Sequence, residues 1–442
     1  MHQSLYTVTV LALSVAACIA FFKYWAATDS DVQRLPGPSP SIASWLWGHE
    51  LLVFQHAASQ MHSIWARSFG GMYKIKGALF HPDIIIATDH AAIHHIFANS
   101  DLYVKAPVFR PIVLNILGKG LVWAEGEDWH RQRKILSPAF SPESVKEMVP
   151  VIYECAERLE RRLSNLILDS SSKDGKTLNI VRYISACTLD IIGMVGLSHS
   201  FSAQSTEPDP DSDAAQIPLT WAPLPLPHSQ GVILDQERGE FKDKSANQEE
   251  AAPTSGSRDI ISLLLHAKQP GNDARGALTD TQILDNVFSV VGHETTATTI
   301  MFTLWELARQ PAIQDRLRAE VLSRGCDLSY DNIQKLEFLD AVVKEGLRLH
   351  PAAPRTERVP LKDDVIYIPF TSSVFNPSRW LEESDPASRP TAVLEMKIIL
   401  ATLIRSIVFL DTGAVVEEKI SPGLQPIVGG KGGVLPLLLK VV

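Results

Sequence analysis

The sequence predicts a mainly α-helical protein with small β-sheets, behind one N-terminal transmembrane helix. Apolar residues recur with helical spacing or in long runs over most of the 442 residues. Strand-like segments are few and short. An uncharged segment near the N-terminus has the length needed to cross a bilayer as a helix. With 45% hydrophobic residues, the chain can bury a large core.

The charge and cysteine content exclude several classes of protein. A formal net charge of -9 lacks the basic excess that phosphate-backbone binding requires, so we expect no nucleic-acid partner. Small molecules or proteins are the expected partners. The four cysteines lie far apart without a CxxC pair, which argues against a disulfide framework or a zinc module and favours a reducing compartment. We interpret them first as small buried hydrophobes: Cys18, Cys155, Cys187 and Cys326.

The N-terminal segment reads as a membrane anchor, with residues 1–28 forming a domain of their own. No residue from Leu5 to Phe22 is charged. A cleaved signal peptide is the alternative, but no basic region precedes the apolar run. Lys23 and Arg34 follow the run, and this charge bias places the rest of the chain on the cytoplasmic side.

Residues 29–442 are expected to form one domain. The prolines of the Leu35 to Pro38 segment give a stiff connector instead of a helix. Two β-branched runs, residues 72–80 and 82–89, predict a hairpin. Residues 202–257 are rich in proline, acidic and small residues, which predicts an irregular, mobile excursion. Helices are predicted over residues 128–135, 141–168, 181–197, 281–309, 313–322 and 336–349.

One helix carries an acid and a base on the same face. Glu345 and Arg348 are three residues apart, and Pro351 stops the helix soon afterwards. Alone, such a pair is typical of a solvated surface. A second arginine, Arg379, follows in the aromatic-flanked, proline-turned segment Phe375 to Trp380.

Two further helices carry candidate site residues. Trp129 and Arg133 are one helical turn apart, so both can face the same way; the alternative is a tryptophan at the core edge beside a surface arginine. The threonine-rich segment Gly292-His293-Glu294-Thr295-Thr296 begins an apolar helix. Its plain interpretation is a buried helix whose threonines bond backward to carbonyls.

Taken together, these segments resemble the cytochrome P450 family, in particular its microsomal-type, fungal-like haem-thiolate monooxygenases. The resemblance implies the cytochrome P450 fold. It also implies a buried ionic triad of Glu345, Arg348 and Arg379 that supports the haem pocket. Ser378 stands where that loop of the family commonly has glutamate.

The resemblance assigns further roles. Trp129, Arg133 and Arg358 would bind the haem propionates, with Arg355 as the competing candidate for the last position. Glu294 and Thr295 would be the catalytic pair that delivers protons during oxygen activation.

The implied function is haem-dependent oxidation of a lipophilic small molecule with O2. The implied cofactor is haem (heme b, iron protoporphyrin IX), and the implied electron donor is an NADPH-dependent flavoprotein reductase. The implied location is the endoplasmic reticulum membrane, with a single span and a cytoplasmic globular domain.

The sequence departs from the family at the metal ligand. The family's glycine-rich loop, whose cysteine thiolate binds iron, should lie between Arg379 and a helix predicted from Ala392 to Phe409. No glycine or cysteine stands between them, so no metal ligand is assigned and the fold is incomplete. Cys326 precedes the Glu345 helix and does not match. Residues 202–257 and 359–374 also look shortened.

Two interpretations follow from this departure. Three excisions between well-matching segments suggest skipped exons or an erroneous gene model. The alternative function is a catalytically inactive, membrane-bound remnant that acts at most in binding or interaction.

Overall fold

The computed structural model describes most of the chain outside the N-terminal run and the long central segment. The N-terminal anchor prediction is not tested, because only residues 14–16 of Leu5 to Phe22 are described. Within the described part of the chain, no helix has the length and apolar character needed to span a membrane. The described residues are 14–16, 30–79, 81–170, 174–197, 199–205, 278–279, 282–283, 285–286, 293–323, 325, 329–366, 391–420 and 423–442.

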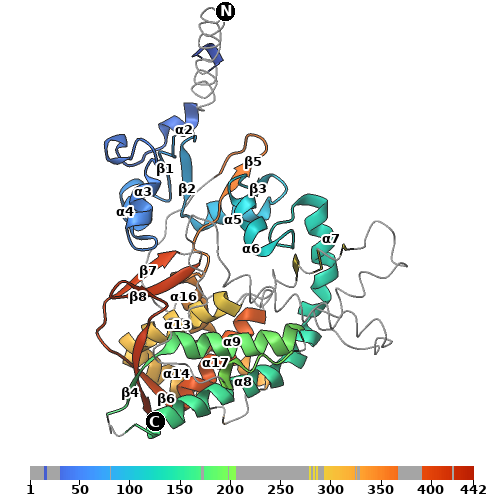
Figure 1. The fold of residues 1–442 in the computed structure, drawn as a ribbon, viewed down its shortest axis with the longest axis vertical. Coiled ribbons are helices and arrows are strands. Elements are labelled where there is room, and N and C mark those ends of the chain that lie inside the picture. Colours follow the sequence, from blue (N-terminus) through green and yellow to red (C-terminus); the bar gives the residue numbers. More distant parts are fainter. Residues whose placement is uncertain are drawn as a thin grey trace, which may run out of the picture. The chain divides into compact units, whose positions relative to one another are not determined.

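The chain forms two compact units, and the predicted class, mainly α with small sheets, is confirmed (Figure 1). The first unit comprises Met1–Tyr103 and Pro360–Ser372, and the second comprises Val104–Val359 and Ser373–Val442. The boundaries between them fall within β3 (Tyr103–Lys105), within β5 (Arg358–Pro360) and after Ser372.

The first unit contains the predicted hairpin. Strands β1 and β2 pair antiparallel, with Met72 opposite Ala87. The connector before them is extended, and Gly37 is required there because a Cβ would lie 2.2 Å from the Lys74 carbonyl oxygen. Its elements are α2 (Ser30–Arg34), η1 (Pro40–Ile42), α3 (Glu50–Gln55), α4 (Gln60–Phe69), β1 (Met72–Ile75), β2 (Ile84–Ala87) and α5 (His90–Ala98).

The second unit holds the long helices and two three-stranded sheets, of order β4-β10-β6 and β7-β8-β9. Its helices are α6 (Phe109–Leu117), α7 (Gly126–Leu136), η2 (Ser137–Phe140), α8 (Pro142–Leu168), α9 (Ile180–Leu197), η3 (Ala203–Ser205), α13 (His293–Arg309), α14 (Pro311–Ser323), α15 (Tyr330–Ile333), α16 (Glu337–Leu349) and α17 (Thr391–Ser406). Its strands are β4 (Lys176–Asn179), β6 (Ile407–Asp411), β7 (Val416–Ile420), β8 (Leu424–Val428), β9 (Lys431–Gly432) and β10 (Pro436–Val441).

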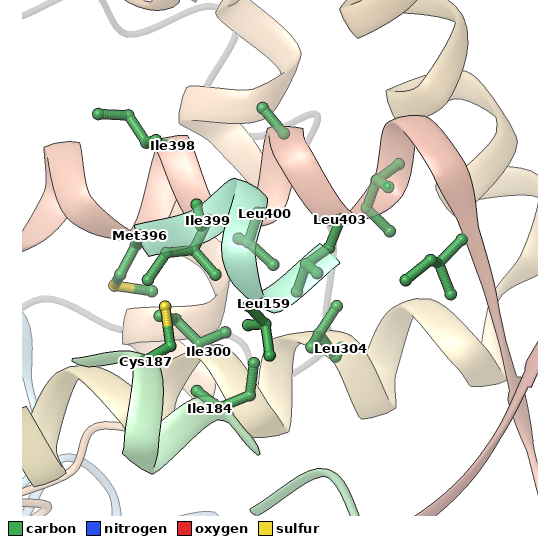
Figure 2. Packing of buried hydrophobic residues seen from close by; sticks show 14 of the residues in the cluster. Leu159, Ile184, Cys187, Ile300, Leu304, Met396, Ile398, Ile399, Leu400 and Leu403 are labelled. Atoms are coloured by element: carbon green, nitrogen blue, oxygen red, sulfur yellow. The ribbon is translucent and has the colours of Figure 1, made fainter. Parts of the chain in front are cut away.

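Helix α8 shows how the sequence sets these elements. Ser141 caps its start by accepting a hydrogen bond from the Ser144 N–H, and Pro142 occupies the first turn, where its missing N–H costs nothing. Its buried residues recur at helical spacing. Figure 2 shows Leu159 of this helix gathered with residues of α9, α13 and α17: Ile184, Cys187, Ile300, Leu304, Met396, Ile399, Leu400 and Leu403.

Most predicted helices are confirmed, but one boundary was wrong. The helix expected to run to Phe409 ends at Ser406, and residues from Ile407 form β6. The residues of β6 alternate between buried and half-exposed as far as Leu410, and Phe409 is fully buried. Strand β6 pairs antiparallel with β10. The apolar run therefore belongs to two elements, the helix α17 and the strand β6. Only part of the helix predicted over 281–309 is described before α13, and only residues 202–205 of the irregular segment are described.

Candidate functional site

The predicted acid and base of α16 form a close ion pair. Arg348 donates from Nε to Glu345 Oε2 at 2.8 Å and from Nη2 to Oε1 at 3.0 Å. This two-pronged geometry is the strong form of an arginine–carboxylate interaction. Glu345 is fully buried, whereas the side chain of Arg348 is 28% exposed. The third predicted member, Arg379, lies outside the described residues.

Neighbouring helices hold α16 in place. Glu320 of α14 accepts hydrogen bonds from the Phe338 and Leu339 N–H groups, at 2.8 and 2.9 Å. A carboxylate is favourable at this end of a helix because unpaired N–H groups point out of it. Gly346 faces α13, where an added Cβ would lie 2.1 Å from Thr303 Oγ1. The glycine of the Glu345–Arg348 motif is therefore needed for close packing of two helices.

Helix α13 contains threonines of both predicted kinds: buried ones that donate hydrogen bonds back to carbonyls, and an exposed one at the start of the helix. Thr299 and Thr303 are buried and bond backward, from Oγ1 to the carbonyls of Thr295 and Thr299 at 3.2 and 2.7 Å. Glu294 is half-exposed and Thr295 is exposed, so this acid and alcohol remain accessible at the start of the helix. Gly292 lies outside the described residues.

Helix α7 carries Trp129 and Arg133 one turn apart, as predicted. Trp129 is half-exposed and its ring packs edge-on against His130, with centroids 5.1 Å apart. Arg133 is exposed, and its guanidinium forms no hydrogen bond or ion pair with another described residue. Arg133 is thus an accessible cation one helical turn after Trp129.

Arg358 lies in a group of charged residues whose other members the sequence motifs did not identify. Lys105, Arg110 and Arg358 surround Glu125, the residue before α7. Arg110 Nη1 is 3.8 Å from Glu125 Oε2, and the Lys105 N–H donates to Glu125 Oε1. Three cations and one carboxylate give this group, which we call the cation cluster, a net charge of +2.

Burial affects the charges of the cation cluster. Desolvation lowers the pKa of Arg358, and the nearby Glu125 carboxylate opposes that effect. Desolvation also lowers the pKa of Lys105, where Glu125 acts against it while Arg358 and Arg110 reinforce it. Mutual repulsion of this kind favours a bound anion. No motif marks Lys105 and Arg110, so only their convergence on Glu125 identifies them.

The Arg110 guanidinium also has an aromatic partner. Its Cζ lies 4.1 Å from the ring centroid of Trp123, and Lys119 Nζ lies 5.7 Å from the same ring. A cation over an indole face is held electrostatically. Arg355, the alternative to Arg358, is exposed, whereas Arg358 is half-buried.

Two of the four cysteines are described, and both are structural. Cys155 and Cys187 are free and buried in the core of α8 and α9. Burial raises the pKa of Cys155 to about 11 and that of Cys187 well above its ordinary value. Neither therefore favours the thiolate form that binds iron. Cys18 and Cys326 lie outside the described residues, as does the segment between Arg379 and Pro390.

Comparison with known proteins shows that the chain belongs to a family of haem monooxygenases. The chain belongs to the cytochrome P450 family, whose model matches residues 36–367. It is 28% identical over 394 residues to cytochrome P450 monooxygenase 205 of Postia placenta, covering 81% of this chain and 72% of that protein. It is 30% identical over 371 residues to cytochrome P450 monooxygenase claU of Ampulloclitocybe clavipes, covering 76% and 68%. By family, it is an oxidoreductase.

Proposed function

We propose that this protein binds haem through the cation cluster and α7, and that it oxidises a lipophilic small molecule with O2. The observation that carries the proposal is that Lys105, Arg110 and Arg358 gather around Glu125, the residue directly before the helix that carries Trp129 and Arg133. A haem carries two propionates, and a group with more cations than carboxylates attracts such anionic groups. Electrons would come from an NADPH-dependent flavoprotein reductase, as the resemblance to the cytochrome P450 family implies.

The carboxylate-binding end of the site fits haem. Arg110 Nε is buried and lacks a hydrogen-bond partner among the described residues, as expected of a donor whose acceptor is on a ligand. Arg358 donates to Thr356 Oγ1 and to the Glu357 carbonyl, at 2.8 and 3.0 Å, which fixes the direction of its side chain. We therefore assign propionate binding to Arg358 in preference to Arg355.

The described residues do not provide the iron ligand. Cys155 and Cys187 are core thiols, and the sequence has no cysteine between Arg379 and Ala392. When bound, haem supplies oxygen activation, while the chain's residues bind and orient it. Glu294 and Thr295 are our proposed proton-delivering pair, from their accessible position at the start of α13.

The alternative function is an inactive binding protein, and the absent cysteine favours it for this polypeptide. Both functions share the ionic pair of Glu345 and Arg348, to which we add Arg379 as the proposed third member. Both also share the proposed anchor, Leu5 to Phe22, which would hold the protein at the endoplasmic reticulum membrane with its globular part in the cytoplasm.

The test compares two probes that share the porphyrin and its iron but differ in whether the two propionates are charged. Purified full-length protein is titrated with haemin and with haemin dimethyl ester, in which both carboxylates are blocked. We expect wild type to bind haemin more tightly. Lys105→Gln and Arg358→Gln should each reduce this preference about tenfold or more, since each removes a charge-assisted contact of roughly 1.5 to 3 kcal/mol.

Arg355→Gln is the matched control, because it removes an exposed cation three residues from Arg358. We expect it to leave the preference for haemin unchanged. Equal affinity of the wild type for both probes would show that the cation cluster does not bind the propionates. Loss of preference in Arg355→Gln, with Arg358→Gln unaffected, would reverse the assignment of the two arginines.

A further inference from the structure

A short loop before α7 rests on two buried polar residues. The Lys119 N–H donates to Asp285 Oδ2 at 2.7 Å, and the Leu121 N–H donates to Asn286 Oδ1 at 2.9 Å. Asp285 is 4% exposed and Asn286 is fully buried. Gly118 has φ +72°, and a Cβ there would lie 2.2 Å from the Asp285 carboxylate. We call residues 118–121 the docked loop.

The same asparagine also holds α7. Asn286 Nδ2 donates to Gln132 Oε1 at 2.8 Å and to the Gln282 carbonyl at 2.8 Å. Gln132 is fully buried, and its Nε2 donates to the Lys119 carbonyl at 3.3 Å and to Asp128 Oδ2 at 3.1 Å. Asn286, Gln132 and the docked loop therefore form a closed ring of hydrogen bonds.

Asn286 uses both donor hydrogens and its side-chain oxygen in these contacts. Its amide has two donor hydrogens, directed to Gln132 and Gln282, and its oxygen accepts from the docked loop. If one of these partners moves away, a buried polar group of the amide loses its hydrogen bond, which costs free energy. Such groups can specify one arrangement of packed elements over others of similar stability.

The ring of hydrogen bonds fixes the arrangement of residues that we propose to contact the cofactor. Gln132 directly precedes Arg133 and lies three residues after Trp129, so its burial sets the rotation of α7 about its axis. The docked loop turns back through hydrogen bonds from the Trp123 and Ala124 N–H groups to the Gly120 carbonyl, at 2.9 and 3.0 Å. It then leads directly to Glu125 of the cation cluster.

We propose that Asp285 and Asn286 are positioning residues for the cofactor pocket. They hold the docked loop and α7 in one arrangement, so that Glu125, Trp129 and Arg133 are oriented before the cofactor binds. This inference rests on the proposed haem-binding function and adds residues for which the family motifs give no role. The energetic benefit is preorganisation, because the groups that contact the ligand need not be ordered during binding.

The first test measures local order in the full-length protein without ligand, by hydrogen–deuterium exchange and mass spectrometry. Asn286→Leu keeps the approximate volume and removes all three hydrogen bonds. We expect exchange of amides in residues 118–136 to rise at least tenfold. Gln132→Leu should raise exchange in the same residues, since it breaks the ring at α7.

Gln314→Leu is the matched control. Gln314 is also a buried amide in the second unit, where it donates to the Phe409 carbonyl at 2.8 Å and accepts from the Phe409 N–H at 2.9 Å. We expect this variant to raise exchange around β6 and to leave residues 118–136 as in wild type. Unchanged exchange of residues 118–136 in Asn286→Leu, or an equal rise in both variants, would overturn the proposal.

The second test measures haemin and haemin dimethyl ester affinity for the same variants. Asn286→Leu should weaken haemin binding at least fivefold and ester binding less, whereas Gln314→Leu should weaken neither. If wild type prefers haemin and Asn286→Leu retains that preference, the positioning role is overturned while the proposed function stands. If wild type binds neither probe, the proposed function and the positioning role both fail, whatever the exchange data show about the loop.

Discussion

His350 Nε2 lies 3.3 Å from Glu306 Oε1, and this pair joins the end of α16 to α13. The other ring nitrogen, Nδ1, lies 3.0 Å from Glu418 Oε1 of β7. The imidazole also stacks on Phe302, with ring centroids 4.8 Å apart and planes 10° from parallel. One buried histidine therefore connects three elements of the second unit through two carboxylates.

These contacts predict a pH-dependent stability. Burial alone would lower the pKa of His350, but the hydrogen bond with Glu306 and the interactions with Glu418 outweigh it and raise the pKa to about 9. Because the folded pKa lies above the ordinary value of 6.5, the stabilisation is complete below about pH 6.5 and is lost as pH rises through 9. We expect His350→Gln to lose roughly 2 to 4 kcal/mol at pH 6 and much less at pH 10.

Urea unfolding of wild type and variant, measured at both pH values, checks this. His49→Gln is the control, since His49 is also buried but its ring nitrogens meet only backbone groups of Ser39 and Lys76. This control reports the general effect of losing a buried imidazole. A His350→Gln deficit that is as large at pH 10 as at pH 6 would contradict the ionic interpretation.

The Glu345–Arg348 pair predicts a large loss on neutralisation. Glu345→Gln should destabilise the protein by about 3 kcal/mol, because it leaves a partly buried guanidinium without its carboxylate. Glu157→Gln is the control: Glu157 pairs with Arg161 at 3.5 Å on the surface of α8, and its loss should cost less than about 1 kcal/mol. Equal urea midpoints for the two variants would show that burial adds nothing to the α16 pair.

Local signals account for the elements that the sequence predicted well. Ser141 and Pro142 mark the start of α8, and the predicted and observed helices there differ by one residue. The end of α17 carries no such signal. Ile407, Val408 and Phe409 continue an apolar run, and only pairing with β10, at the end of the chain, makes them a strand.

The contacts of the site divide in the same way, into those that local sequence spacing predicts and those that depend on distant segments. Glu345 and Arg348 are neighbours on one helix, so their pairing follows from spacing. Glu125 meets Lys105 from 20 residues away in sequence, and His350 meets Glu418 from 68 residues away. Asn286 reaches both a loop and a helix more than 150 residues earlier. No periodicity within a segment encodes contacts of this kind.

The polypeptide should lack the red-shifted ferrous carbon-monoxide spectrum of thiolate-ligated haem. That spectrum requires a cysteine thiolate on iron, and burial keeps Cys155 and Cys187 as thiols. The measurement is a difference spectrum of the reduced protein after haemin addition. A clear thiolate-type band would show that a cysteine of this chain reaches the iron, and Cys18→Ser and Cys326→Ser would identify which of the two undescribed cysteines does so.

The uncharged N-terminal run predicts stable membrane attachment. Protein containing Leu5 to Phe22 should remain in the membrane pellet after carbonate extraction, whereas a chain starting near Leu35 should be released. N-terminal sequencing of the mature protein distinguishes an anchor from a cleaved signal peptide. A mature N-terminus between residues 20 and 35 would rule out the anchor.

The genomic DNA should encode, in frame between the codons for Arg379 and Ala392, an unread segment with a phenylalanine, glycines and a cysteine. The flanking segments match those that bracket the family's ligand loop, and α17, which begins where the loop should end, contributes residues between Leu394 and Ile404 to the buried core. Retention of both flanks is hard to explain if the loop had never been made. Sequencing that shows the two flanks contiguous, without an intron, would leave the inactive remnant as the better interpretation.

A chain with that segment restored should bind haem through its cysteine and show the red-shifted carbon-monoxide band. Arg133→Ala in the restored chain should then weaken haem retention, because Arg133 is an exposed cation on α7 whose proposed partner is a propionate. Losing that contact should cost roughly 1.5 to 3 kcal/mol, or about 10- to 150-fold in haem affinity. Lys134→Ala, the adjacent exposed cation on the same helix, is the control and should retain haem as the restored wild type does. Equal haem loss from both variants would mean that α7 contributes only general positive charge, and no loss from either would remove Arg133 from the propionate site.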